Sequence, residues 1–118
     1  MKKIIFIVFV LAAAFQSCTF KSAVPANATI TDTVSYSKTI AHLDSTMCNS
    51  CHVYGGTGNG DFTTYAGLKA KANGGAQSSL YARVVTLKDM PTPGSGYTLT
   101  DAQRNEYAAW IQQGAKNN

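Results

Sequence analysis

The chain has 118 residues, of which 45% are hydrophobic and 14% are charged, a composition that suits one small globular domain. Its formal net charge is +4, from ten basic and six acidic residues. Two of the basic residues, Lys2 and Lys3, lie in a segment that we expect to be removed, and the remainder carries +2 from eight basic and six acidic residues. No cluster of lysine and arginine remains, so we expect no nucleic-acid partner.

The first residues have the pattern of a secretory signal. Lys2 and Lys3 are followed by an uninterrupted apolar run over residues 4–15. The run is shorter than the ~20 apolar residues that a membrane-spanning helix needs, and it matches the apolar core of a signal peptide. We therefore predict that residues 1–17 are a signal peptide of the lipoprotein type.

Ser17 and Cys18 resemble the end of a bacterial lipobox, in which a small residue precedes a cysteine that becomes the lipidated mature N-terminus. Lipidation would give each of the three cysteines a role, one for lipid and two for the motif at residues 48–52. The alternative is cleavage after Ala14, which would leave a free thiol in an oxidising compartment. We predict that Cys18 is lipidated and tethers the protein to the periplasmic side of a bacterial membrane. The sequence does not indicate which leaflet.

Two regions follow the predicted signal peptide. Residues 18–35 include the lipidated cysteine and are rich in Thr, Ala and Ser with little periodicity, so they are expected to form a flexible tether. Residues 36–118 are expected to form one all-α domain, because no convincing strand pattern is present. Its first helix is expected to begin near Ser37, as N-cap, and to run into Cys48. The apolar residues at helical spacing in this helix are Ile40, Leu43 and Met47.

Three more helices are expected further along the chain. One opens at Thr63 or Thr64 and stops before the glycines that follow Asn73. Another begins near Ser78 or Ser79. Its predicted buried face contains Leu80, Val84 and Leu87. The last opens with a capping box of Thr100 and Gln103, ends at Gly114, and has an apolar stripe that includes Tyr107, Trp110 and Ile111.

The sequence Cys48-Asn49-Ser50-Cys51-His52 is the most informative motif. Two thiols two residues apart can form thioether bonds to the two vinyl groups at one edge of a haem, and the histidine that follows can supply the proximal nitrogen to the iron. In an exported protein this pattern predicts one covalent haem c. A thioredoxin-like dithiol, which needs a βαβ pattern, and a structural zinc site, which needs four ligands, are the weaker alternatives.

The loop after this motif contains four glycines, Gly55, Gly56, Gly58 and Gly60. They do not have the spacing of a phosphate-binding loop, and no strand precedes them. We predict instead that the backbone passes close to the haem macrocycle, where glycine permits a close approach.

Met90 is the predicted distal ligand. Methionine opposite histidine is the ligand pair of cytochromes c. Met1 leaves with the signal, and Met47 directly precedes Cys48, so it is expected to pack on the proximal side. The alternative is that Met90 only fills a gap in the core.

His42 is the other conceivable ligand. It lies beside the haem motif in sequence, and its helical neighbours Lys38 and Asp44 are charged. We therefore expect His42 to be a surface residue.

Three segments in this order, CNSCH at residues 48–52, KDMP at 88–91 and LTDAQ…AAWIQQGA at 99–115, make the chain resemble short bacterial monohaem cytochromes c. The resemblance covers nearly the whole predicted domain. It implies a cytochrome c fold, in which the first and last helices cross beside the haem. It also implies a role for each site residue: thioether bonds at Cys48 and Cys51, proximal ligation by His52 and distal ligation by Met90.

One feature of that family is missing. Many cytochromes c have a proline after the haem motif whose carbonyl orients the proximal histidine. No proline occurs between His52 and Pro91, so the partner that orients His52 is not identified by the sequence.

The resemblance and the motif together predict an electron-transfer protein. It would be a membrane-tethered monohaem cytochrome that cycles between ferric and ferrous iron with donor and acceptor proteins that the sequence does not identify. We expect no catalysis, because the protein would only tune the iron through ligands, burial and hydrogen bonds. The alternatives are a haem-based ligand binder or peroxidase-like enzyme with an open distal site, and a cytochrome subunit of a larger oxidoreductase.

Overall fold

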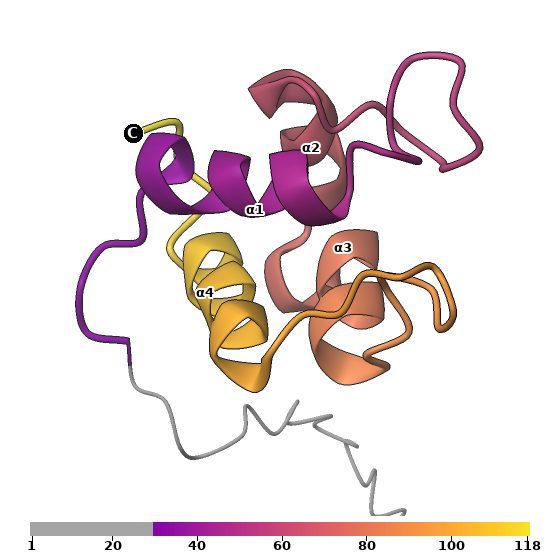
Figure 1. Ribbon diagram of the computed structural model, residues 1–118. Coiled ribbons are helices and arrows are strands. Elements are labelled where there is room, and N and C mark those ends of the chain that lie inside the picture. The colour runs from indigo at the N-terminus through magenta and orange to yellow at the C-terminus, as the bar shows by residue number, and fades with distance from the viewer. Residues whose placement is uncertain (1–29) are drawn as a thin grey trace, which may run out of the picture.

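The structure, a computed structural model, describes residues 30–118 as a helical domain (Figure 1). The described part of the chain contains no strand, so the all-α prediction is confirmed there. The predicted signal peptide and Cys18 lie outside the described residues. The helical elements are, in chain order, η1 (Tyr36–Ile40), α1 (Ala41–Met47), α2 (Tyr65–Ala72), η2 (Gly75–Gln77), α3 (Ser79–Tyr81), η3 (Ala82–Thr86) and α4 (Asp101–Gln112).

The first helix begins earlier than the sequence predicts. Its N-cap is Ser35 and not Ser37, because the Ser35 hydroxyl accepts the N–H of Lys38. The cause is a long-range contact with the end of the chain. Asn118 accepts the N–H of Tyr36 through its side chain at 2.9 Å and the N–H of Ser37 through its backbone carbonyl at 2.9 Å. These bonds satisfy amide groups that would otherwise lack a partner at the start of a helix.

The other helix ends follow local signals and confirm the predictions. Thr64 caps α2 and Ser78 caps α3, each with a side-chain oxygen that accepts a backbone N–H. Thr100 and Gln103 form the predicted capping box of α4. After α4, Gly114 takes a left-handed conformation with φ of 94°. Such a conformation ends a helix at little cost only in glycine.

The prediction for Leu87 is wrong. It was expected to share the buried face of Leu80 and Val84, which are 5% and 3% exposed, but Leu87 is 62% exposed. The reason is a change of helical pitch in η3, where the N–H of Leu87 donates to the carbonyl of Ala82, five residues back. This wider π-type turn rotates Leu87 away from the face that α-helical spacing would give it.

The core lies where α4 packs against the rest of the domain. α4 contacts η1, η3 and α3, and Figure 1 shows it beneath the continuous rod formed by η1 and α1. Tyr107 and Trp110 on α4 are both 0% exposed. Trp110 stacks on Tyr36 of η1 with ring centroids 5.9 Å apart, and its indole N–H donates to the carbonyl of Lys116 at 2.9 Å. These side chains join the first helix to the last.

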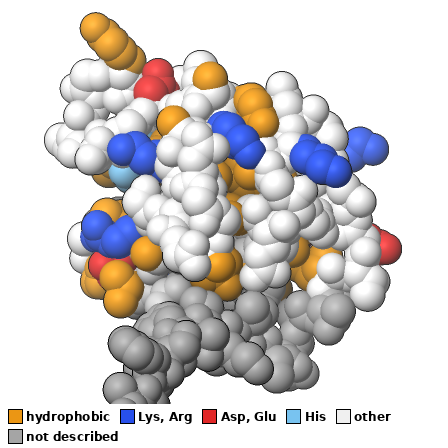
Figure 2. All heavy atoms as spheres, turned by 180° about the vertical axis from the view of Figure 1, so that it is seen from behind, with side chains coloured by type: hydrophobic (Ala, Val, Ile, Leu, Met, Phe, Trp, Pro, Cys, Tyr) orange, Lys and Arg blue, Asp and Glu red, His pale blue; other side chains and the backbone are white. Residues whose placement is uncertain are grey.

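The surface carries scattered charges. Figure 2 shows lysine and arginine side chains as separate groups on one face. Within residues 30–118, two ion pairs are formed, Arg83 with Asp89 and Lys88 with Asp101, each at 2.7 Å. In the range 30–118, none of the helices has the length and hydrophobicity needed to cross a membrane.

The burial of Trp110 predicts a large effect of its removal. Trp110→Ala should lower the free energy of unfolding by about 3–5 kcal/mol, because it leaves a cavity in the core. The matched control is Tyr54→Ala, since Tyr54 is 92% exposed. That change should stay within about 0.5 kcal/mol of the wild type. Denaturant unfolding of the purified native protein measures both values, and equal losses would show that Trp110 is not a core residue.

Candidate functional site

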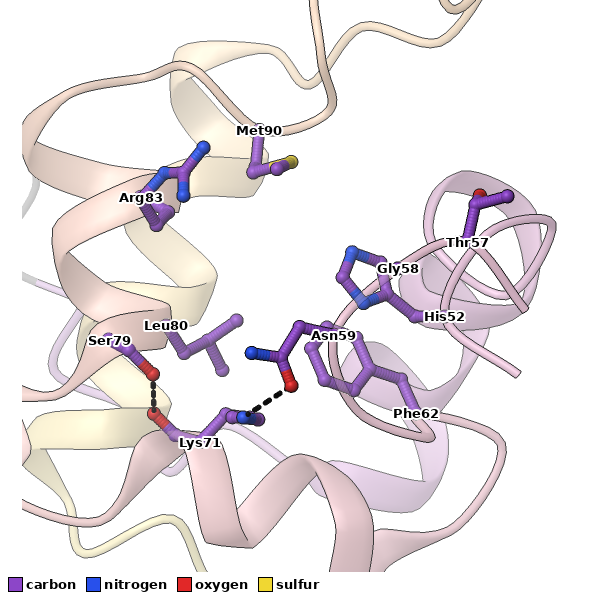
Figure 3. Close-up of a pocket in the computed structure, with 10 residues that line it drawn as sticks. All are labelled: His52, Thr57, Gly58, Asn59, Phe62, Lys71, Ser79, Leu80, Arg83 and Met90. Carbon is purple, nitrogen blue, oxygen red and sulfur yellow. Dashed lines mark hydrogen bonds between the residues drawn. The ribbon is translucent and has the colours of Figure 1, made fainter. Parts of the chain in front are cut away.

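Two adjoining hollows lie between the loop that follows His52 and the segment around Met90 (Figure 3). The larger has a volume of about 270 Å³ and the smaller a volume of about 160 Å³. Four residues line both hollows: His52, Thr57, Gly58 and Met90. We therefore regard the two hollows as one space and call it the candidate pocket.

The two ends of the candidate pocket differ in chemistry. Cys48 and Cys51 line the smaller end. Leu80, Lys71 and Arg83 line the larger end, and Figure 3 shows them opposite the loop that carries His52. All four site residues predicted within the described part of the chain therefore line one pocket.

The cysteines lie on a tight turn directly after α1. The N–H groups of Cys51 and His52 both donate to the carbonyl of Cys48, at 3.1 and 2.9 Å, so the turn folds back on itself. Both cysteines are free of disulfide bonds, with Cys48 half-buried and Cys51 exposed. Burial, with the charge of nearby Asp44 as the second cause, raises the pKa of the Cys48 thiol to about 12. The thiolate that attacks disulfides or binds metal ions is therefore disfavoured at Cys48.

The His52 ring is held between Phe62 and the glycine-rich loop. It stacks on Phe62 with ring centroids 4.2 Å apart and an angle of 3° between the planes. The N–H of Phe62 donates to the carbonyl of His52 at 2.8 Å. A Cβ atom at Gly58 would lie 2.6 Å from Nδ1 of the ring, so only glycine allows the loop to pass there. The predicted approach of this loop to a macrocycle stays a prediction, and the close approach that the structure shows is to the histidine ring.

The Met90 segment is anchored by Arg104 on α4. Arg104 is only 8% exposed, and its Nη1 donates to the carbonyls of Val84 at 2.6 Å and Met90 at 3.0 Å. The N–H of Met90 donates to the carbonyl of Arg83 at 3.3 Å. This role of Arg104 was not predicted from the sequence. The available signal was its position on the apolar stripe of α4, one turn before Tyr107.

Met47 and His42 take positions that agree with the sequence-based expectations. Met47 is half-buried and packs against the core, although it also lines the cysteine end of the pocket. His42 is exposed.

Asp44, the charged neighbour of His42, is buried, with 1% of its surface exposed. The hydroxyl of Tyr107 on α4 donates to its Oδ1 at 2.7 Å. Burial raises the pKa of Asp44 to about 7, against the opposing effect of this hydrogen bond. The pairing of Asp44 with Tyr107 could not be predicted from the sequence alone, because the two residues lie on different helices.

The free donor groups of the pocket fit a covalently attached haem. Both cysteines are free of disulfide bonds. Nδ1 of His52 is buried with no hydrogen-bond partner among the described residues, so the missing proline is not replaced there by another acceptor. The sulfur of Met90 accepts a long hydrogen bond of 3.5 Å from Thr92. Two thiols, an imidazole and a thioether could therefore hold such a group without breaking a strong existing contact.

Comparison with known proteins identifies no relative: no family model matches the chain, and no curated protein or solved structure matches it significantly. Among residues 30–118, no three side chains of His, Cys, Asp or Glu are grouped as ligands for a metal ion.

The raised pKa of Asp44 predicts a stability that falls with rising pH. The folded chain keeps this proton up to about pH 7, whereas the unfolded chain releases it near the ordinary aspartate pKa of 3.8. The unfolded state thus binds fewer protons in this window, and the free energy of unfolding decreases as pH rises through it. Asp44→Asn removes the titration and keeps an oxygen that accepts from Tyr107.

Urea unfolding at pH 5 and pH 8 measures this effect. The wild type should lose about 3 kcal/mol more stability than Asp44→Asn between the two values, because each pKa unit corresponds to about 1.4 kcal/mol. A wild type whose loss equals that of Asp44→Asn would contradict the raised pKa.

Proposed function

We propose that this chain is a membrane-tethered monohaem cytochrome c that transfers single electrons. The observation that supports it most is that two thiols, one imidazole and the thioether of Met90 line one pocket, although they come from the turn after α1 and from a loop near α4. A haem bound there supplies an iron that changes between the ferric and ferrous states. Cys48 and Cys51 would hold the haem covalently, and His52 and Met90 would bind its iron.

The chain's own contacts explain how such a site is kept in order. Phe62 and Gly58 restrict the ring of His52 from two sides, and Arg104 fixes the backbone of Met90. Because the ring of His52 and the backbone of Met90 are held by the chain itself, little reorganisation of these groups would accompany a change of charge at a haem bound there. Leu80 and Phe62, 5% and 7% exposed, make part of the wall apolar and limit the access of water.

The proposal extends to the fold and the location. The first and last helices are in contact through Tyr107 and Asp44, which agrees with a cytochrome c fold. Cys18 lies outside the described residues, and its lipidation is proposed from the sequence alone. Residues 18–35 would then tether the domain to the periplasmic side of the membrane. There the domain would exchange electrons with a donor and an acceptor protein.

Covalent attachment is the first test of this function. Acid–organic extraction of the purified native protein should leave its haem on the polypeptide, and the mass should include one haem. Cys48→Ser combined with Cys51→Ser should yield a protein without bound haem after extraction, because both thioether bonds are lost. The control is Ser50→Ala within the same turn, which should keep the haem. Native protein that contains zinc and no haem would refute the proposal.

Met90→Ala tests the distal ligand and separates an electron carrier from a ligand-binding haem protein. Loss of the sulfur should lower the reduction potential, change the ferric iron from low spin to high spin or water-ligated, and permit binding of carbon monoxide to the reduced form. Visible absorption spectra and a redox titration measure these changes. The matched control is Met47→Ala, which should leave the ligation unchanged, because Met47 packs against the core and precedes Cys48.

Two results would overturn the assignment of Met90. If the wild type already binds carbon monoxide as readily as Met90→Ala, the distal site is open, and a ligand binder or a peroxidase-like enzyme is the better description. If Met47→Ala changes the ligation and Met90→Ala does not, the first helix must supply the distal ligand.

A further inference from the structure

The buried pair of Asp44 and Tyr107 joins two helices, but it neither holds the haem nor binds its iron in the function proposed above. Asp44 is 1% and Tyr107 0% exposed. Oδ1 of Asp44 accepts the tyrosine hydroxyl at 2.7 Å, while Oδ2 is buried with no hydrogen-bond partner in the described part of the chain. An ionised carboxylate in this position costs free energy, because one of its oxygens has lost its hydrogen bonds to water and has gained no other donor in the described part of the chain. The pair is therefore sensitive to any change of charge nearby.

The pair lies beside the cysteine end of the candidate pocket. Asp44 is one helical turn before Cys48, whose N–H donates to the Asp44 carbonyl at 2.9 Å. The hydroxyl of Tyr107 lies 3.9 Å from Sγ of Cys48. A group bonded to this sulfur would therefore lie close to both members of the pair.

The groups that face Asp44 do not fix its protonation state, so this state can change when a nearby charge changes. They are Tyr107 on α4, Cys48 at the end of α1 and Tyr36 on η1. None of these groups is basic, so no cation of the described residues holds the carboxylate in its charged form. Burial, followed by the charge of Asp44, raises the pKa of Tyr107, which stays a neutral hydrogen-bond donor.

We propose that Asp44 and Tyr107 form a proton-binding site coupled to the haem, so that the protein takes up a proton when it takes up an electron. This inference rests on the function proposed above. In the balanced step, a one-electron donor protein reduces ferric iron to ferrous, and the carboxylate of Asp44 takes one proton from solvent to become the neutral acid. Oxidation by the acceptor reverses both transfers.

The sign of the coupling follows from electrostatics. Ferric iron carries one more positive charge than ferrous iron, so it favours the ionised form of Asp44, and reduction favours the protonated form. The affinity of Asp44 for a proton is thus higher in the reduced protein. By reciprocity, the reduction potential is higher at low pH. It falls as the pH rises from the pKa of Asp44 in the oxidised protein to its pKa in the reduced protein.

A redox titration of the purified holoprotein across about pH 5 to pH 9 tests the proposal. The wild-type potential should fall across part of this range by up to about 59 mV for each tenfold change in proton concentration. Asp44→Asn should remove this slope and keep a potential close to the low-pH value of the wild type at every pH. Tyr107→Phe should move the slope to higher pH, because the ionised carboxylate loses the hydroxyl that donates to it. Glu106→Gln, which removes a carboxylate from the neighbouring position on α4, should leave the slope unchanged.

A measurement on the wild type alone keeps the proposal testable if a variant fails to fold. Reduction in weakly buffered solution should consume protons in the pH range of the slope, and the infrared difference spectrum should show a protonated carboxyl group in the reduced state. A buried pair that only joined two helices would change neither readout.

The possible failures can be told apart. Protein without covalent haem refutes the proposed function and this inference together. Protein with haem and with ligation by His52 and Met90, but with a potential independent of pH, refutes the proton site alone. A slope that survives in Asp44→Asn also refutes it, because the proton then binds to another group.

Discussion

The packing of α4 against the rest of the domain is the constraint on which both sides of the candidate pocket depend. Tyr107 on α4 holds Asp44 of α1 through a buried hydrogen bond of 2.7 Å, and α1 leads directly into the turn at residues 48–52. Arg104, one turn earlier on α4, donates to the carbonyl of Met90 at 3.0 Å. The same helix therefore positions the segment with the imidazole and the segment with the thioether, and a shift of α4 would change the geometry between them.

Much of the fold could be predicted because its signals are local. Thr64 and Ser78 cap helices through a hydroxyl that reaches an N–H three residues away, a distance that sequence spacing encodes directly. The start of the first helix could not be predicted in this way. Ser35 becomes its cap because Asn118, from the other end of the chain, binds the following amides. The burial of Leu87 was predicted wrongly for a different reason. Its local turn is wider than the α-helical turn on which the spacing pattern was based.

The candidate site shows the same division between local and distant information. A five-residue motif specifies the positions of two thiols and an imidazole, so their proximity follows from the sequence. Met90 could be selected only by elimination and by a family resemblance, and its place in the same pocket as His52 depends on packing. The roles of the buried polar residues Asp44 and Arg104 could not be predicted from the sequence, because each depends on a partner in another element. Such groups must find partners when they leave water, and this requirement helps to specify how the helices align.

The contact between Asn118 and the start of η1 has a consequence for engineering. The polypeptide enters and leaves the folded unit at nearly the same point, since Asn118 bonds to Ser35 and Tyr36. In Figure 1 this point lies on the side of the domain away from the loops after His52 and Met90. Domains with adjacent ends tolerate circular permutation and insertion into a host loop. The unit could thus be transplanted as a cassette into another scaffold, with its pocket directed away from the junction.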